Sequence, residues 1–258
     1  MLINKENFMS FLDWLYSTYK PNPTVDPWGT LQIIVVLLCI GFVVASTLLL
    51  KNKSDKTKYI VLASLAIVMI IFGVTRRVIG FINPTGHEMT FNRIMKILLP
   101  RPGCAISCWL ALIALIVRKK YFYNFASIVG ILCATIFFSY PSVGFTNKYI
   151  LFENLYSIVT HSIFLVICIC FITYKFVDFD YKSIWKEGIC LGAMLLYVFL
   201  EIYVLKIDPD PFYFLKDNEV QEVVGMGYGL YLPLYLLFMI VYMGSYYVIP
   251  KIKELKKK

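Results

Sequence analysis

A cysteine at the start of an apolar stretch is the first candidate for chemistry. Cys104 follows Pro100-Arg101-Pro102-Gly103, and two prolines with a glycine cannot form a regular helix. Cys104 is therefore predicted to lie in the first regular turn of a helix, where unpaired N–H groups and the helix dipole favour an anion. Arg101 adds positive charge, and both effects favour the thiolate, the nucleophilic form of cysteine. Cys108 and Ser107 lie on the same helix face, so Cys108 stays open as an alternative nucleophile.

A histidine further along the chain could act as a base toward such a thiol. His161 is the only histidine predicted to lie inside a spanning helix, and Asn154 and Ser157 precede it at helical spacing. This spacing places the three polar side chains on one helix face. A histidine is the usual base for a cysteine nucleophile. The alternative is that His161 only hydrogen-bonds a neighbouring helix.

Charged side chains within apolar stretches are costly in a membrane and indicate functional sites. Two adjacent arginines and a glutamate occur in such stretches, and all are predicted to lie toward the same side of the membrane. The arginines could hold a phosphate group, or they could simply extend to the membrane interface. The predicted substrate-binding residues are Arg76, Arg77, Arg101, Asn154, Ser157 and Glu201.

The other residues that could do chemistry favour structural roles. His87 is predicted to be a solvated loop residue. Without a His/Cys cluster in a short window, neither a metal site nor a cofactor is predicted. Five further cysteines lack the spacing of a disulfide framework and are expected to pack as small apolar side chains: Cys39, Cys133, Cys168, Cys170 and Cys190.

The elements that must position these residues are membrane-spanning helices. The chain is 59% hydrophobic and 16% charged, whereas an ordinary soluble domain is about 25% charged. Apolar residues gather in runs of roughly twenty, the length that crosses a hydrocarbon core of about 30 Å. The sequence therefore predicts an all-α, polytopic membrane protein whose seven transmembrane helices form one bundle. The predicted spans are 28–50, 59–82, 97–117, 121–138, 150–174, 188–204 and 224–249.

The charge distribution predicts how the bundle is oriented. Lys and Arg in short loops stay in the cytoplasm. With the C-terminus inside, 15 of the 25 basic residues and five acidic residues are cytoplasmic, which leaves the N-terminus outside. The basic residues lie in short loops rather than on one folded face, so no nucleic-acid partner is predicted. We expect an interfacial segment (1–27), a transmembrane domain (28–250) and a basic cytoplasmic tail (251–258).

Three short motifs resemble those of a known family. They are Leu99-Pro100-Arg101-Pro102-Gly103-Cys104, Thr160-His161-Ser162 and Phe212-Tyr213-Phe214-Leu215, in that order. This order resembles the bacterial YwaF-like family of integral membrane proteins, which has animal relatives associated with phospholipid acyl transfer. The resemblance covers residues 70–250 and implies that Cys104 is the acyl-accepting nucleophile and His161 its base. The chain departs from the family pattern at Pro102, where members often have a histidine, and at 225–229, which replaces a Pro/Trp-rich motif.

Two functions from different classes follow. The first is lipid acyl transfer at the outer leaflet of a bacterial plasma membrane, from a membrane phospholipid to a second lipid or a lipoprotein. The alternative is a non-enzymatic membrane carrier or lipid-binding partner protein, which would use the same polar residues without covalent chemistry. The inner half of the predicted bundle is almost purely apolar, which counts against a carrier.

Overall fold

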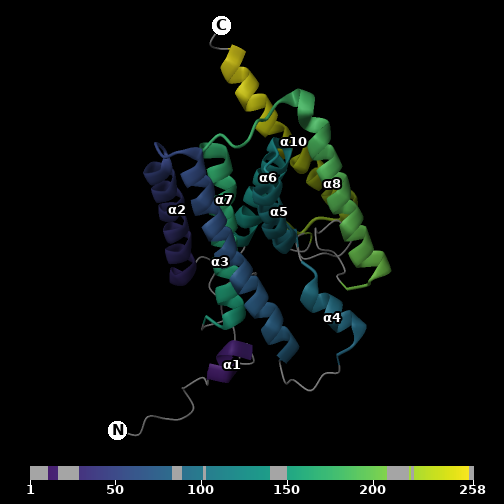
Figure 1. Ribbon diagram of the computed structural model, residues 1–258. Coiled ribbons are helices and arrows are strands. Elements are labelled where there is room, and N and C mark those ends of the chain that lie inside the picture. The colour runs from purple at the N-terminus through teal and green to yellow at the C-terminus, as the bar shows by residue number, and fades with distance from the viewer. Residues whose placement is uncertain are drawn as a thin grey trace.

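The computed structural model describes residues 11–16, 29–82, 89–100, 103–139, 150–207, 221 and 224–255. Every regular element in these residues is a helix, and most of the helices run side by side in one bundle (Figure 1). The all-α prediction is confirmed. Two residues with predicted roles, Arg101 and His87, lie outside the described residues. Segments 1–10 and 17–28 of the expected interfacial region also lie outside them.

Six helices are long and apolar enough to cross a membrane among the residues that the structure describes. The protein is therefore a multi-pass membrane protein. Five of these helices are α2 (Thr30–Leu50), α3 (Asp55–Ile82), α6 (Lys120–Ser139), α7 (Phe152–Thr173) and α10 (Tyr228–Leu255). The sixth span is α8 (Ile184–Phe199) with its π-helical continuation η3 (Leu200–Val204), and the short 3-10 helix η2 (Tyr181–Ser183) precedes it.

The predicted third span, 97–117, is not a single helix. The chain forms α4 (Phe91–Leu98), becomes extended at Leu99, and starts α5 (Gly103–Val117) only afterwards. The reason is Pro100, which disfavours helical geometry in the residue before it. The 15 residues of α5 give a length of about 22 Å, which is less than the hydrocarbon thickness of about 30 Å. The structure thus has six helices of spanning length and one shorter apolar helix where seven spans were predicted.

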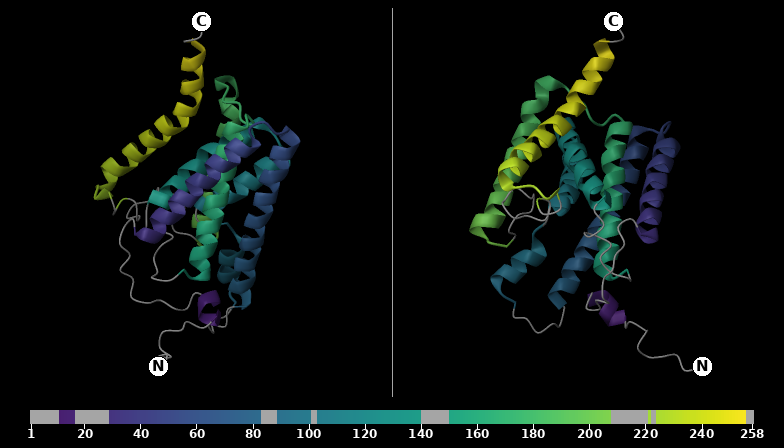
Figure 2. Two further views of the ribbon diagram at one scale, coloured as in Figure 1. Left: turned by 90° about the vertical axis from the view of Figure 1, so that its left-hand side faces the viewer. Right: turned by 180° about the vertical axis from the view of Figure 1, so that it is seen from behind.

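The basic loops gather at one end of the bundle. When α5 is included, the helices from α2 to α10 other than the short α4 alternate in direction along the chain. The turn after α2, the turn between α5 and α6, and the segment after α7 therefore lie at the same end as the C-terminal end of α10 (Figure 1). We call this the basic end. It is the end for which the charge count predicts a cytoplasmic position. The short helix α1 (Phe11–Tyr16) and α4 lie at the opposite end (Figures 1 and 2).

The packed core lies where α5, α6 and α7 meet, with α3 against α7. Phe125, Phe137, Phe164 and Phe171 are fully buried there. A close approach of α6 and α7 depends on Gly130, because a Cβ at that position would lie 2.5 Å from Cys168 Sγ. Few side chains of α2 and α10 are buried, and many of their large apolar side chains are exposed. These two helices therefore present apolar surface to the lipid.

A buried polar cluster joins α6 to α8 near the basic end. The Asn124 side-chain amide donates hydrogen bonds to Glu187 Oε1 over 2.6 Å and to the Asp178 carbonyl over 2.8 Å. Its own oxygen accepts a bond from the Asp178 N–H. Buried polar groups need such partners, because leaving one unpaired costs its full desolvation free energy. The cluster fixes the segment between α7 and α8 against the start of α6.

Candidate functional site

Cys104 lies in the first turn of α5, as the sequence predicts. It is partly buried, and its thiol donates a long hydrogen bond to the Cys133 carbonyl of α6, with the sulfur 3.8 Å from the oxygen. Ser107, one turn further along α5, is completely buried. The start of α5 therefore turns its polar side chains toward α6 and the core.

His161 lies in the middle of α7 and is buried. Its ring stacks on Phe137 of α6, with centroids 3.7 Å apart, and tilts against Phe164. The Nδ1 atom lies 2.6 Å from the carbonyl oxygen of Ser157. A carbonyl can only accept, so Nδ1 carries the proton of a neutral imidazole and the lone pair is on Nε2. Nε2 is buried and has no hydrogen-bond partner among the residues that the structure describes.

Cys104 and His161 both contact α6. Among the described residues, no hydrogen bond joins the two side chains. Cys104 contacts Cys133, and His161 contacts Phe137 one turn further along α6. In the part of the chain that the structure describes, the bonds of the two side chains go to the carbonyls of Cys133 and Ser157. The structure thus brings both residues to the junction of α5, α6 and α7.

The two predicted arginines are held by protein partners. Arg76 forms an ion pair with Glu153 of α7, its Nε lying 2.9 Å from both carboxylate oxygens. Arg77 donates from Nε to the Leu98 carbonyl at the end of α4 and from Nη1 to the Gly73 carbonyl. Both arginines therefore tie α3 to its neighbours rather than only extending to the membrane interface.

A basic pocket lies between these arginines and α4. Its volume is about 330 Å³, and residues from α1, α3, α4 and α7 line it. Arg76, Arg77, Arg93, Lys96 and Glu153 provide its charged side chains. Arg93 and Lys96 are not among the site residues predicted from the sequence. Their three-residue spacing beside the apolar Ile94 and Leu98 is the signal that could have identified an amphipathic helix with a basic face.

A second, smaller cavity adjoins the basic pocket. Its volume is about 210 Å³, and Arg77 lines both spaces. Cys108 is the thiol that lines this cavity, with Trp109 on α5 and Thr160 on α7. Cys104 does not line it, so the alternative nucleophile faces the cavity while the first candidate faces the core. Most of the other lining residues are apolar: Met69, Ile70, Val74, Leu98, Ala105 and Leu112.

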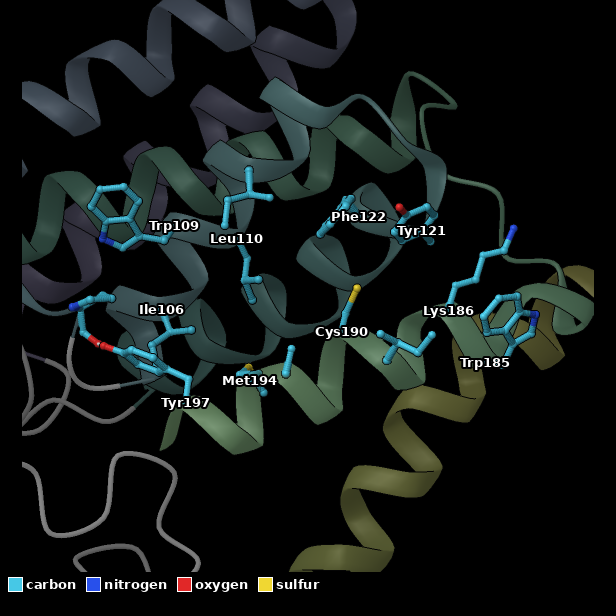
Figure 3. A pocket seen from close by; sticks show the side chains of 14 residues that line it. Ile106, Trp109, Leu110, Tyr121, Phe122, Trp185, Lys186, Cys190, Met194 and Tyr197 are labelled. Carbon is cyan, nitrogen blue, oxygen red and sulfur yellow. The ribbon is translucent and has the colours of Figure 1, made fainter. Parts of the chain in front are cut away.

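An apolar groove of about 590 Å³ lies on the other face of α5, between α5, α6 and α8 (Figure 3). Tyr121, Trp185 and Lys186 lie at one end of it, and Ile106, Trp109 and Tyr197 at the other (Figure 3). Trp109 lines both this groove and the small cavity. Because its lining is almost entirely apolar, the groove is suited to a hydrocarbon chain.

The remaining predicted substrate-binding residues are divided between two places. Asn154 and Ser157 lie on α7, where Asn154 is buried and the Ser157 carbonyl accepts from His161. Glu201 is completely buried in η3, and the Tyr197 hydroxyl donates to it over 2.9 Å. That hydroxyl also lies 3.3 Å from the Pro100 carbonyl, which places Glu201 near the start of α5. Glu201 does not line the basic pocket.

Comparison with known proteins identifies one family. A sequence model of the TMEM164 family matches residues 24–249. This match includes nearly all of the segment in which the three motifs occur, but it does not carry the YwaF-like name. Neither a curated protein nor a solved structure matches the chain.

Proposed function

The chain belongs to the TMEM164 family, and we propose that this multi-pass membrane protein transfers acyl chains between membrane lipids. One observation carries the proposal. The basic pocket adjoins, across Arg77, a cavity lined by the thiol of Cys108, which lies one turn from Cys104 on α5. His161 on the neighbouring α7 has a buried Nε2 with no hydrogen-bond partner among the described residues. A phospholipid ester needs this combination of a cationic site for its phosphate and a nucleophile nearby.

The proposed nucleophile is Cys104 and the proposed base is His161. Cys104 lies at the N-terminus of α5, where the helix dipole favours the thiolate. Its thiol leaves the Cys133 carbonyl and transfers its proton to His161 Nε2, a movement that fits the loose geometry of sites without substrate. Phe137 stacks on the imidazole and fixes its orientation. Cys108, one turn away and lining the cavity, is the alternative nucleophile.

The reaction proceeds in two balanced steps. The sulfur forms a bond to the carbonyl carbon of a glycerophospholipid ester, and the bond from that carbon to the glycerol oxygen breaks. His161 donates the proton to the departing oxygen, which leaves a lysophospholipid and an acyl thioester. A hydroxyl of a second lipid, or an amine of a lipoprotein, then attacks the thioester, and its proton returns through His161 to the thiol.

The other predicted residues receive substrate-binding roles in this proposal. Arg76, Arg77 and Arg101 hold the lipid phosphate. Asn154 and Ser157 lie on α7 one to two turns before His161 and would orient the substrate there, and Glu201 fixes Tyr197 beside the start of α5. The apolar groove offers the acyl chain a site between helices, because ligand sites are mostly apolar with a few polar groups.

Acyl exchange in proteoliposomes tests the proposal. The purified protein is mixed with a phospholipid that carries one deuterated chain and with an unlabelled lysophospholipid, and the products are analysed by mass spectrometry. We expect the deuterated chain to appear on the acceptor, and N-ethylmaleimide to stop the exchange by alkylating the thiol. Exchange no faster than in protein-free liposomes, with the lipids still bound, would instead identify a non-enzymatic lipid-binding protein.

A further inference from the structure

We propose that the basic pocket is a phosphate-binding site completed by α4, and that Arg93 and Lys96 recognise the phosphate of a membrane glycerophospholipid. The choice of a lipid as the ligand rests on the proposed function, whereas the phosphate chemistry rests on the pocket itself. Neither Arg93 nor Lys96 belongs to the residues that the sequence motifs single out.

The pocket carries an excess of positive charge. Among the described residues that line it, four charged side chains are cationic and one, Glu153, is a carboxylate that pairs with Arg76. The charge of Arg77 is not neutralised by its two bonds, because both acceptors are backbone carbonyls. Lys96 makes no hydrogen bond or ion pair with any residue that the structure describes. A phosphate diester would supply an anion to Arg77 and Lys96, and Arg and Lys are the side chains that bind phosphate.

The structure of α4 suits a position at the membrane interface. The Thr90 hydroxyl caps the helix by accepting the Arg93 N–H over 3.3 Å. Phe91 and Leu98 remain 62% and 44% exposed, which leaves apolar side chains next to the basic ones. An amphipathic helix of this kind lies in the interface plane, with its basic side chains at the level of the lipid phosphates. The bond from Arg77 to the Leu98 carbonyl fixes the end of α4 over the pocket.

The space beyond the pocket identifies the phosphate as that of a lipid rather than a free ion. Arg77 belongs both to the pocket and to the neighbouring cavity, whose walls are mostly apolar. A phosphate bound at Arg77 therefore has a cationic site on one side and an apolar space on the other. A glycerophospholipid has this same order of groups, with glycerol and acyl chains attached to one ester oxygen. Inorganic phosphate has nothing to place in the apolar space.

Native mass spectrometry of the full chain, released from detergent micelles, tests the site directly. The micelles contain either dioleoylphosphatidylglycerol or dioleoylglycerol, which differ only by the phosphate headgroup. We expect the protein to retain the phosphatidylglycerol at least about tenfold more than the diglyceride, since one charge-assisted hydrogen bond corresponds to about that factor. The double variant Arg93→Gln/Lys96→Gln should lose this preference. An excess of inorganic phosphate should not displace the lipid.

Two matched variants make the result specific. Lys51→Gln/Lys53→Gln removes the same charge from exposed residues at the basic end, and it should keep the preference. Arg93→Lys/Lys96→Arg keeps both charges, and it should retain the preference if the double glutamine variant lost it through charge rather than misfolding. Equal retention of the two lipids by the wild-type protein, an unchanged preference in Arg93→Gln/Lys96→Gln, or displacement by inorganic phosphate would each overturn the proposal.

The result of this lipid-binding test can be distinguished from the result of the acyl-exchange test. Loss of lipid preference in Arg93→Gln/Lys96→Gln establishes the phosphate site even if the wild-type protein exchanges no acyl chains. Conversely, the wild-type protein could exchange acyl chains without preferring phosphatidylglycerol over the diglyceride. That result would refute the phosphate site but not the proposed acyl transfer.

Discussion

Replacement of Cys104 by alanine is expected to lower the rate of acyl exchange by about 10³-fold or more, as loss of a covalent nucleophile does in other enzymes. The physical reason is that the acyl thioester forms on the Cys104 sulfur, which alanine lacks. The loss should appear in the rate of exchange and not in lipid binding. The folded state should survive, because Cys104 is only partly buried and makes one weak hydrogen bond. The measurement is the deuterated-chain exchange in proteoliposomes.

Two other cysteine variants serve as controls for this result. Cys39→Ala removes a buried thiol of α2, outside the cavities that the structure describes, and it should leave exchange unchanged. Cys108→Ala distinguishes the two thiols of α5. Full exchange by Cys104→Ala together with loss in Cys108→Ala would transfer the role of nucleophile to Cys108 and contradict the assignment.

Replacement of His161 by glutamine is expected to lower acyl exchange by about 10²- to 10⁴-fold, the usual contribution of a general base. The Nδ1–H of His161 bonds to the Ser157 carbonyl, so Nε2 is the atom that can take a proton. Glutamine keeps a polar side chain of similar length but has no group that takes up a proton. Without a base, the thiol must ionise unaided in a buried site, where an isolated charge is costly.

The variant His161→Asn separates a catalytic role from a structural one. The asparagine amide can take the place of Nδ1–H and donate to the Ser157 carbonyl, so it restores the local hydrogen bond. A histidine that only stabilises α7 should be rescued by asparagine, whereas a base should not. Wild-type exchange in His161→Asn would show that Nε2 takes no part in the reaction.

The membrane architecture follows from the sequence because spanning length is a local property. A run of apolar residues must be long enough to cross the hydrocarbon core, and six of the seven predicted runs form helices that meet this condition. The third run does not form one spanning helix, because hydropathy does not include the restriction that a proline places on the backbone. Pro100 keeps Leu99 extended, and the apolar sequence is thus divided between α4 and α5.

The site was predictable in composition but not in arrangement. Arg76 and Arg77 stand out because charges are rare within spans, yet their partners on α7 and α4 depend on how the helices pack. The rotation of α5, which turns Cys104 to the Cys133 carbonyl and Cys108 to the cavity, is likewise a tertiary property. Arg93 and Lys96 were not predicted as site residues, because α4 has only eight residues and its sequence is hard to distinguish from that of a loop.

Detection of an acyl thioester on Cys104 is the most direct test of the proposed transfer. The wild-type protein is incubated with a dioleoyl phospholipid without an acceptor, quenched in acid, and analysed as intact protein and as peptides by mass spectrometry. We expect one oleoyl group on the protein, released by neutral hydroxylamine, and located on the peptide that contains Cys104. An unmodified protein that nevertheless exchanges acyl chains, or an oleoyl group attached elsewhere, would contradict the assignment of Cys104 as the nucleophile.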